Sequence, residues 1–293
     1  WEGLEAWGKE KKLTAKKDFT YIETNNPEDN STNIDQAIRN GFTTIISLSY
    51  LQAEELENAA KDNPKLKFAL VDGEITGKKN ISSATFKDQE SAYLAGLAAA
   101  YTTKSDQVGF IGGMEGPVIQ RFQSGFEAGV KAGATALNKE ITVNVQYAAS
   151  YDSLDKGKAI AASMYKEGVD ILYQAAGSTG AGVFQEAKAR NENDYSRKVW
   201  VIGVDRDQAD EGDYKMENGE TGNFTLTSTK KNVGAEVKEF AETSHNDKFP
   251  GGKHLTFGLK EEGVDLTKGQ LSEEAYQAVS DAKEKIISGD FRL

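Results

Sequence analysis

Residues 107–114, Gln-Val-Gly-Phe-Ile-Gly-Gly-Met, begin a pattern of strand, turn and helix that indicates the fold class of this chain. The apolar run favours a buried strand, and the two glycines that follow it favour a tight turn. A helical pattern over 118–132 comes next, and a second β-rich run covers 141–147. A strand, a helix and a strand in this order predict a βαβ unit, in which the two strands are parallel.

The same alternation extends from end to end of the sequence. Trp1, Leu4 and Trp7 recur at three-residue spacing and predict an amphipathic helix at the start. The predicted strands are 19–23, 43–48, 67–71, 107–111, 141–147, 170–174, 199–204, 224–228 and 254–257, and the predicted helices are 32–40, 51–61, 88–103, 118–132, 154–167, 181–190, 233–243 and 273–288. Strands that alternate with helices in this way predict an α/β protein with parallel sheets.

Length and composition limit the class of protein further. The 293 residues suggest two domains, and the polar stretch 104–106 is the candidate crossing between them. The net charge of −11 argues against a nucleic-acid partner, because phosphate backbones are bound by an excess of Lys and Arg. The absence of cysteine excludes disulfides, thiolate catalysis and cysteine-based metal sites.

The sequence is poor in catalytic and cofactor motifs. His245 and His254 are its two histidines, and they are interpreted as structural or surface residues. There is no nucleophile elbow, no P-loop and no GxGxxG, and the Asp cluster that a nucleoside hydrolase would need is not visible. We therefore expect no enzyme activity, no cofactor and no metal site.

Polar residues and glycine turns follow several predicted strands. Asp72 comes directly after one apolar run and Asp205 after another, while 112–113 and 177–180 supply glycine turns. In open α/β sheets, ligands bind beyond the carboxyl ends of the strands. A ligand site there is therefore one interpretation, and the alternative is that each Asp is a helix cap or a turn residue.

Several stretches together resemble the basic membrane protein (BMP) family, the nucleoside-binding lipoproteins of ABC importers that include purine nucleoside receptors. They follow the family order over nearly the whole chain and read, in sequence, Thr-Phe-Lys-Asp-Gln-Glu at 85–90, Val-Gly-Phe-Ile-Gly-Gly-Met at 108–114, Phe-Gln-Ser-Gly-Phe-Glu-Ala-Gly at 122–129, Ala-Ala-Gly-Ser-Thr-Gly-Ala-Gly-Val-Phe at 175–184, Val-Ile-Gly-Val-Asp-Arg-Asp-Gln at 201–208, and Thr227-Ser228 with Lys231.

The resemblance implies a type I periplasmic-binding-protein fold, with two Rossmann-like lobes, a ligand cleft between them and a hinge of several chain crossings. The expected N-terminal lobe is 1–105, completed by about 229–262. The expected C-terminal lobe is 106–228, completed by about 263–293. The family begins with a strand that this sequence does not contain before Trp1, so the first strand is expected to be missing.

The resemblance also assigns contacts to the sugar of a nucleoside. Asp205 matches the family Asp that accepts hydrogen bonds from the ribose hydroxyls, and Lys231 matches the Lys that donates to the same sugar. Gly177 and Gly180 match the glycine turn that approaches the ligand. A carboxylate can accept both hydrogen bonds of a vicinal diol, so the chemistry suits these residue types. Lys231 as a solvated helix start and the glycines as plain turns remain alternatives.

Three further residues match positions that face the base. Asp72 matches an acidic residue that could accept from a ring N–H, and Tyr151 falls where the family has an aromatic that stacks on the purine. Met114 follows the Gly-Gly turn and is expected to touch the base. Tyr151 and Met114 as core residues remain alternatives.

The leading hypothesis is thus a substrate-binding component of an ABC importer that binds nucleosides, with purines favoured, and delivers them to a permease. The resemblance implies a monomer on the extracytoplasmic face of a bacterial cell membrane, held by a lipid anchor that this chain lacks. A binding protein for a sugar or other small polar solute, or a ligand sensor outside transport, is the alternative.

Overall fold

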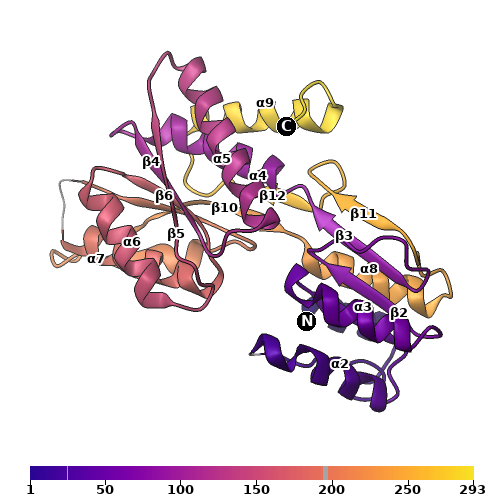
Figure 1. Ribbon diagram of the computed structural model, residues 1–293. Helices are drawn as coiled ribbons and strands as arrows, with labels where there is room; N and C mark the ends of the chain where they lie inside the picture. Colours follow the sequence, from indigo (N-terminus) through magenta and orange to yellow (C-terminus); the bar gives the residue numbers. More distant parts are fainter. Residues whose placement is uncertain (25, 194–196) are drawn as a thin grey trace. The chain divides into compact units, whose positions relative to one another are not determined.

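The computed structural model describes residues 1–24, 26–193 and 197–293, which form two compact units (Figure 1). The first unit comprises Trp1–Phe86 and Asn232–Phe257, and the second comprises Lys87–Lys231 and Gly258–Leu293. The chain therefore passes between the units after Phe86, after Lys231 and after Phe257, as a multi-crossing fold requires. The expected boundary at residue 105 falls at Phe86 instead, because the helix 88–102 packs within the second unit.

The sheet of the first unit is parallel and, among the described residues, has the order β1-β2-β3-β11. Leu48 pairs with Val71 at the end of the first two strands, and Phe257 pairs with Phe86. The strands are β1 (Thr44–Leu48), β2 (Lys67–Val71), β3 (Ile81–Phe86) and β11 (His254–Phe257).

Two groups of helices cover this sheet. The helices α2 (Asn30–Arg39) and α3 (Ala53–Asp62) enclose a core with Phe68 and Leu70 of β2. The helix α8 (Val233–His245) contacts β1 and β2, and α1 (Glu2–Glu10) packs on it through Trp7.

The predicted strand 19–23 is wrong. Phe19 makes an isolated bridge with Ala15, and its buried ring packs against Trp7, so its apolar character reflects a loop contact with a helix. The strand β3 was not predicted, because Ser82 and Ser83 interrupt its apolar run. Both serines are buried, and both donate hydrogen bonds to carbonyl groups of the unit.

The first unit also contains a buried carboxyl group with a raised pKa. Glu236, in the first turn of α8, is 6% exposed. Burial, followed by the nearby Glu239 carboxylate, raises the pKa of Glu236 from 4.5 to about 7. The folded state therefore binds this proton more tightly than the unfolded chain does. The stability that it contributes is complete below pH 4.5 and is lost as the pH rises through about 7.

We expect Glu236→Gln to abolish this part of the pH dependence. The free energy of unfolding should fall by about 2 kcal/mol more in the wild type than in the variant between pH 4.5 and 8. Denaturant unfolding of both proteins at the two pH values measures this difference. The contributions of the other carboxyl groups to the pH dependence cancel, because both proteins contain them. An equal fall in both proteins would contradict the assignment.

The sheet of the second unit is larger and has the order β12-β10-β7-β6-β4-β5 in the described part of the chain. The strands β10, β7, β6, β4 and β5 are parallel, and β12 runs antiparallel to β10. They are β4 (Gln107–Gly112), β5 (Thr142–Tyr147), β6 (Ile171–Ala175), β7 (Trp200–Gly203), β10 (Thr225–Lys231) and β12 (Val264–Leu266).

Helices cover both faces of this second sheet (Figure 1). Phe110 of β4 packs against Phe126 on one face, whereas its neighbour Ile111 joins a core with Met164 and Val183 on the other. The first face carries α4 (Asp88–Thr102), α5 (Pro117–Ala136) and α9 (Glu273–Ser288), and the second carries α6 (Leu154–Lys166) and α7 (Gly180–Asn193). The strand β12 and the hairpin of β8 (Asp213–Lys215) and β9 (Thr221–Asn223) were not predicted from the sequence.

Candidate functional site

The carboxyl edge of the larger sheet gathers most of the residues that the sequence singles out. Because β10, β7, β6, β4 and β5 are parallel, their carboxyl ends lie at one edge. The residues at or just beyond those ends are Met114, Tyr151, Gly177, Asp205 and Lys231. The structure thus brings these five residues together in the second unit, whereas Asp72, which is also predicted to face the base, belongs to the first unit.

Asp205 is held in a tight turn beyond β7. Its φ is 67°, in the left-handed region that Asp tolerates better than most residues, and its side chain is exposed. Its carbonyl oxygen accepts a hydrogen bond from the Lys231 backbone N–H at 2.9 Å. Gln208 fixes the same turn, because its Oε1 accepts from the Val204 N–H at 2.8 Å and its own N–H donates to Ser228 Oγ at 3.1 Å. The turn therefore presents the carboxylate next to the end of β10.

Lys231 is the last residue of β10, and its side chain is 5% exposed. Its Nζ lies 3.0 Å from Oδ1 of Asp88, which is completely buried, and 5.1 Å from the centre of the Phe122 ring. The other carboxylate oxygen of Asp88 pairs with Arg121, whose Nη2 is 3.1 Å away. Lys231 is therefore not the solvated helix start that was the alternative prediction; it belongs to a buried ion-pair cluster.

Tyr173 of β6 lies near this cluster, with its ring against that of Phe122. Its ring is completely buried, and its hydroxyl is 2.9 Å from Thr229 Oγ1. Burial raises the pKa of Tyr173 well above 10; the Thr229 hydrogen bond lowers it, and the charges of Asp205 and Asp88 raise it further. The two carboxylates therefore act on the same phenol, which stays neutral.

Tyr151 packs on the glycine turns of neighbouring strands. A Cβ atom added to Gly113 would lie 2.4 Å from Cδ1 and Cε1 of the Tyr151 ring, so this close approach requires glycine. Gly177 has a φ of 58°, and the Tyr151 carbonyl accepts from the Thr179 N–H at 3.0 Å. The ring is only partly buried, so Tyr151 lies on the glycine turns at the edge of the sheet.

Gly180, at the start of α7, is close to Gln174. A Cβ atom on Gly180 would lie 2.1 Å from Oε1 of Gln174, a residue that is 1% exposed and donates from Nε2 to Gln208 Oε1 at 2.9 Å. Gly180 therefore makes room for a buried side chain that supports the Asp205 turn. Its contact with a ligand remains a prediction.

Asp72 and Met114 complete the predicted set. Asp72 belongs to the first unit, where it follows β2 directly with a φ of 65°, and its N–H donates to the Ala84 carbonyl at 2.8 Å. It repeats in that unit the left-handed turn that Asp205 makes in the other. Met114 is 41% exposed, which contradicts its alternative interpretation as a core residue.

Sequence reasoning missed Asp88, Arg121 and Gln208. Asp88 begins α4, where an Asp is ordinarily a helix-start residue, and Arg121 lies on the following helix. No spacing rule connects either of them to Lys231, which is more than a hundred residues away along the chain. What could have pointed to these three residues is their position inside or beside the family motifs 85–90, 122–129 and 201–208.

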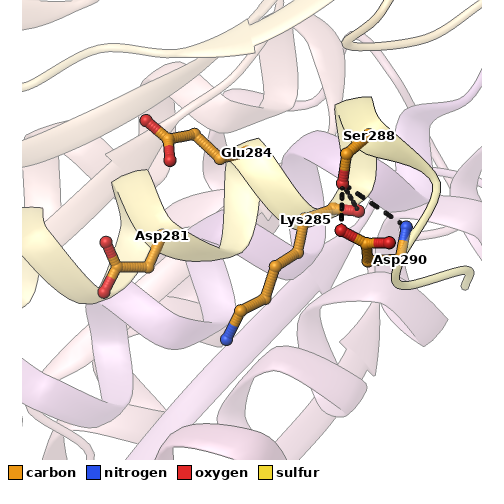
Figure 2. A pocket seen from close by; sticks show the side chains of 5 residues that line it. All are labelled: Asp281, Glu284, Lys285, Ser288 and Asp290. Atoms are coloured by element: carbon orange, nitrogen blue, oxygen red, sulfur yellow. Dashed lines mark hydrogen bonds between the residues drawn. The ribbon is translucent and has the colours of Figure 1, made fainter.

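The described residues were also compared with the requirements of a metal site, a membrane span and a second pocket. No group of His, Asp and Glu side chains in the described ranges could hold a metal ion. Among the helices in the described ranges, none has the length and hydropathy that a membrane-spanning segment requires. Figure 2 shows a depression on α9 lined by Asp281, Glu284, Lys285, Ser288 and Asp290, in which Ser288 Oγ donates to Asp290. It contains none of the residues that the sequence singled out.

The architecture is that of type I periplasmic-binding proteins and related regulators. An ABC transporter solute-binding protein from Aeropyrum pernix K1 has a TM-score of 0.84 at 24% identity, with 99% of this chain and 86% of that chain covered. A LacI family regulator from Enterococcus faecium, solved with bound ribose, has a TM-score of 0.63 at 13% identity, with 92% and 93% covered. These similarities confirm the predicted fold class.

The sequence comparisons identify the family. Residues 1–292 match the Bmp family, described as "ABC transporter substrate-binding protein PnrA-like". The ABC transporter nucleoside-binding protein BmpA of Lactococcus lactis is 46% identical over 290 residues, which are 99% of this chain and 82% of that protein. Basic membrane protein A of Borreliella burgdorferi is 33% identical over 254 residues, with 85% and 70% covered. This chain belongs to the Bmp family and is a substrate-binding protein of ABC transporters, not an enzyme.

Proposed function

We propose that this protein binds nucleosides, with purine nucleosides favoured, and delivers them to an ABC permease. The observation that carries the proposal is the exposed carboxylate of Asp205, held in a left-handed turn and joined by a backbone hydrogen bond to Lys231. A carboxylate accepts both hydrogen bonds of a vicinal diol, and an ammonium group donates to sugar oxygens. The nucleoside-binding relative from Lactococcus lactis supports the same ligand class.

The base is proposed to stack on Tyr151. Its ring lies against Gly113 at the same edge of the sheet, and an aromatic face accepts a flat heterocycle without requiring a particular hydrogen-bonding edge. Met114, exposed in the same turn, adds an adaptable apolar surface. Asp72 is the proposed acceptor for a ring N–H, which would favour one base over another.

A role in transport implies that the protein changes conformation when it binds its ligand. ABC substrate-binding proteins of this family are extracytoplasmic. We propose that ligand stabilises one conformation by contacts that it makes only there, and that the permease recognises this state. The lipid anchor and the monomeric state remain predictions from the family resemblance.

A calorimetric titration with adenosine, guanosine, inosine, uridine and ribose tests the proposal. We expect the purine nucleosides to bind more tightly than uridine, and free ribose to bind at least about 100-fold more weakly, because it lacks the apolar burial of the base. Heat from ribose with none from any nucleoside would contradict the proposal. It would favour the second candidate, a binder of sugars or other small polar solutes, which Asp205 and Lys231 alone could serve.

A further inference from the structure

The first turn of α4 contains a completely buried carboxylate that the family comparison does not assign to the ligand. Asp88 is 0% exposed and divides its oxygens between two cations. Oδ1 lies 3.0 Å from Lys231 Nζ, and Oδ2 lies 3.1 Å from Arg121 Nη2 and 3.2 Å from Arg121 Nε. We call these three residues the Asp88 cluster.

Helix packing places the members of this cluster. The helices α4 and α5 approach so closely that a Cβ atom on Gly129 would lie 2.0 Å from the Tyr93 carbonyl, and this contact brings Arg121 of α5 beside the start of α4. Asp88 occupies the first residue of α4, where the positive end of the helix dipole favours a carboxylate. A buried carboxylate with two cationic partners and a helix N-terminus is thus well compensated.

The cluster determines how Lys231 can act. A lysine ammonium on a flexible stem can take many rotamers, and its charge is costly where the side chain is nearly buried. Lys231 is 5% exposed, and the Asp88 carboxylate supplies both a fixed partner for Nζ and a compensating charge. Arg121 keeps the cluster as a whole positive, so the carboxylate does not cancel the attraction of Lys231 for an electron-rich oxygen.

We infer that Asp88 is a positioning residue, which holds Lys231 charged and oriented toward the ribose oxygens of the ligand. The inference rests on the proposed function, since it takes Lys231 as a ribose contact. Asp88 itself acts through Lys231 and does not need to touch the ligand. The consequence is that changes at Asp88 should affect the sugar selectively and leave recognition of the base intact.

A double-mutant cycle with Asp88→Asn and Lys231→Met tests the inference, with inosine and hypoxanthine as probes in calorimetric titrations. We expect Asp88→Asn to weaken inosine binding about 10-fold with hypoxanthine binding unchanged, because one charged hydrogen-bond donor is misplaced. In the Lys231→Met background the same substitution should weaken inosine binding by less than about 2-fold.

Glu90→Gln is the matched control. Glu90 is 8% exposed in the same turn of α4, and its Oε2 accepts from the Leu259 N–H at 2.8 Å, so its loss perturbs the helix start without changing the Asp88 cluster. It should leave the ratio of inosine to hypoxanthine affinity unchanged.

If Asp88→Asn fails to fold, a second variant tests the same inference. Asp88→Glu, which keeps the charge but displaces the carboxylate, should show the same selective loss of inosine affinity.

Three results would overturn the inference: equal losses for inosine and hypoxanthine, additive effects of the two substitutions, or failure of both Asp88 variants to fold, which would make the role structural. Failure of the proposed function is distinguishable from all of these. It would appear in the wild type as an absence of inosine binding, before any variant is measured.

Discussion

Asp205→Ala is expected to lower the affinity for inosine about 100-fold and to leave hypoxanthine binding nearly unchanged. The substitution removes a carboxylate proposed to accept two hydrogen bonds from the ribose diol. Hydrogen bonds to a charged group contribute about 1.5–3 kcal/mol each, so a loss of about 3 kcal/mol is a cautious expectation. The backbone hydrogen bond from Lys231 to residue 205 does not depend on the side chain, so the turn should persist.

Calorimetric titration of both ligands measures this effect, and Asp207→Ala is the matched control. Asp207 is exposed on the same loop, and its Oδ1 accepts from the Ala209 N–H at 3.0 Å, so its removal changes the local charge equally. We expect it to change inosine affinity less than about 3-fold. Similar losses for inosine and hypoxanthine on Asp205→Ala would show that Asp205 does not hold the ribose.

Gly129→Ala is expected to destabilise the second unit by about 2 kcal/mol, despite the better helix propensity of alanine. The new Cβ would lie 2.0 Å from the Tyr93 carbonyl and 3.0 Å from Gly96 Cα, so α4 and α5 must separate. Overpacking of this kind costs about 1–3 kcal/mol. In a unit of this size, a thermal-unfolding midpoint lower by about 4–8 °C follows.

Gly234→Ala provides the contrast within the same chain. Gly234 is also helical, but the nearest atom to its added Cβ is 3.6 Å away, in Gly3. We expect this variant to unfold within about 0.5 kcal/mol of the wild type or slightly above it, since alanine is favoured in helices. Unfolding midpoints from differential scanning calorimetry compare the two. A midpoint for Gly129→Ala equal to that of Gly234→Ala would show that the helices adjust without cost.

The regular elements were predictable where the local pattern was strong. The apolar run 67–71 and the helical pattern 273–288 coincide with β2 and α9 as the structure has them. The run 81–86 was not predictable, because Ser82 and Ser83 are buried in β3 with hydrogen bonds to distant residues. Conversely, the apolar character of Phe19 predicts a strand but reflects a contact with the Trp7 ring.

Some residues of the candidate site could likewise be predicted from the sequence, and others could not. Asp72 and Asp205 could be found from the sequence because each follows an apolar strand directly, and the structure places both in left-handed turns there. Asp88 could not be found. Its partner Lys231 lies close to Asp88 because β10 pairs with β7 in the sheet. Arg121 lies close to Asp88 because α5 packs on α4.

The α/β class, the family and the residues at the ends of the strands follow from local patterns, because strand and turn signals are local and the motifs follow the family order. Only the assembled structure shows that the first segment of the first unit ends at Phe86 and not at residue 105, that the Tyr151 ring lies on Gly113, and that Lys231 is paired with Asp88. Each of these depends on contacts between segments distant in the chain. The close packing and the charge compensation in these contacts form only when the sheet and helices assemble, so they cannot be predicted from local sequence patterns.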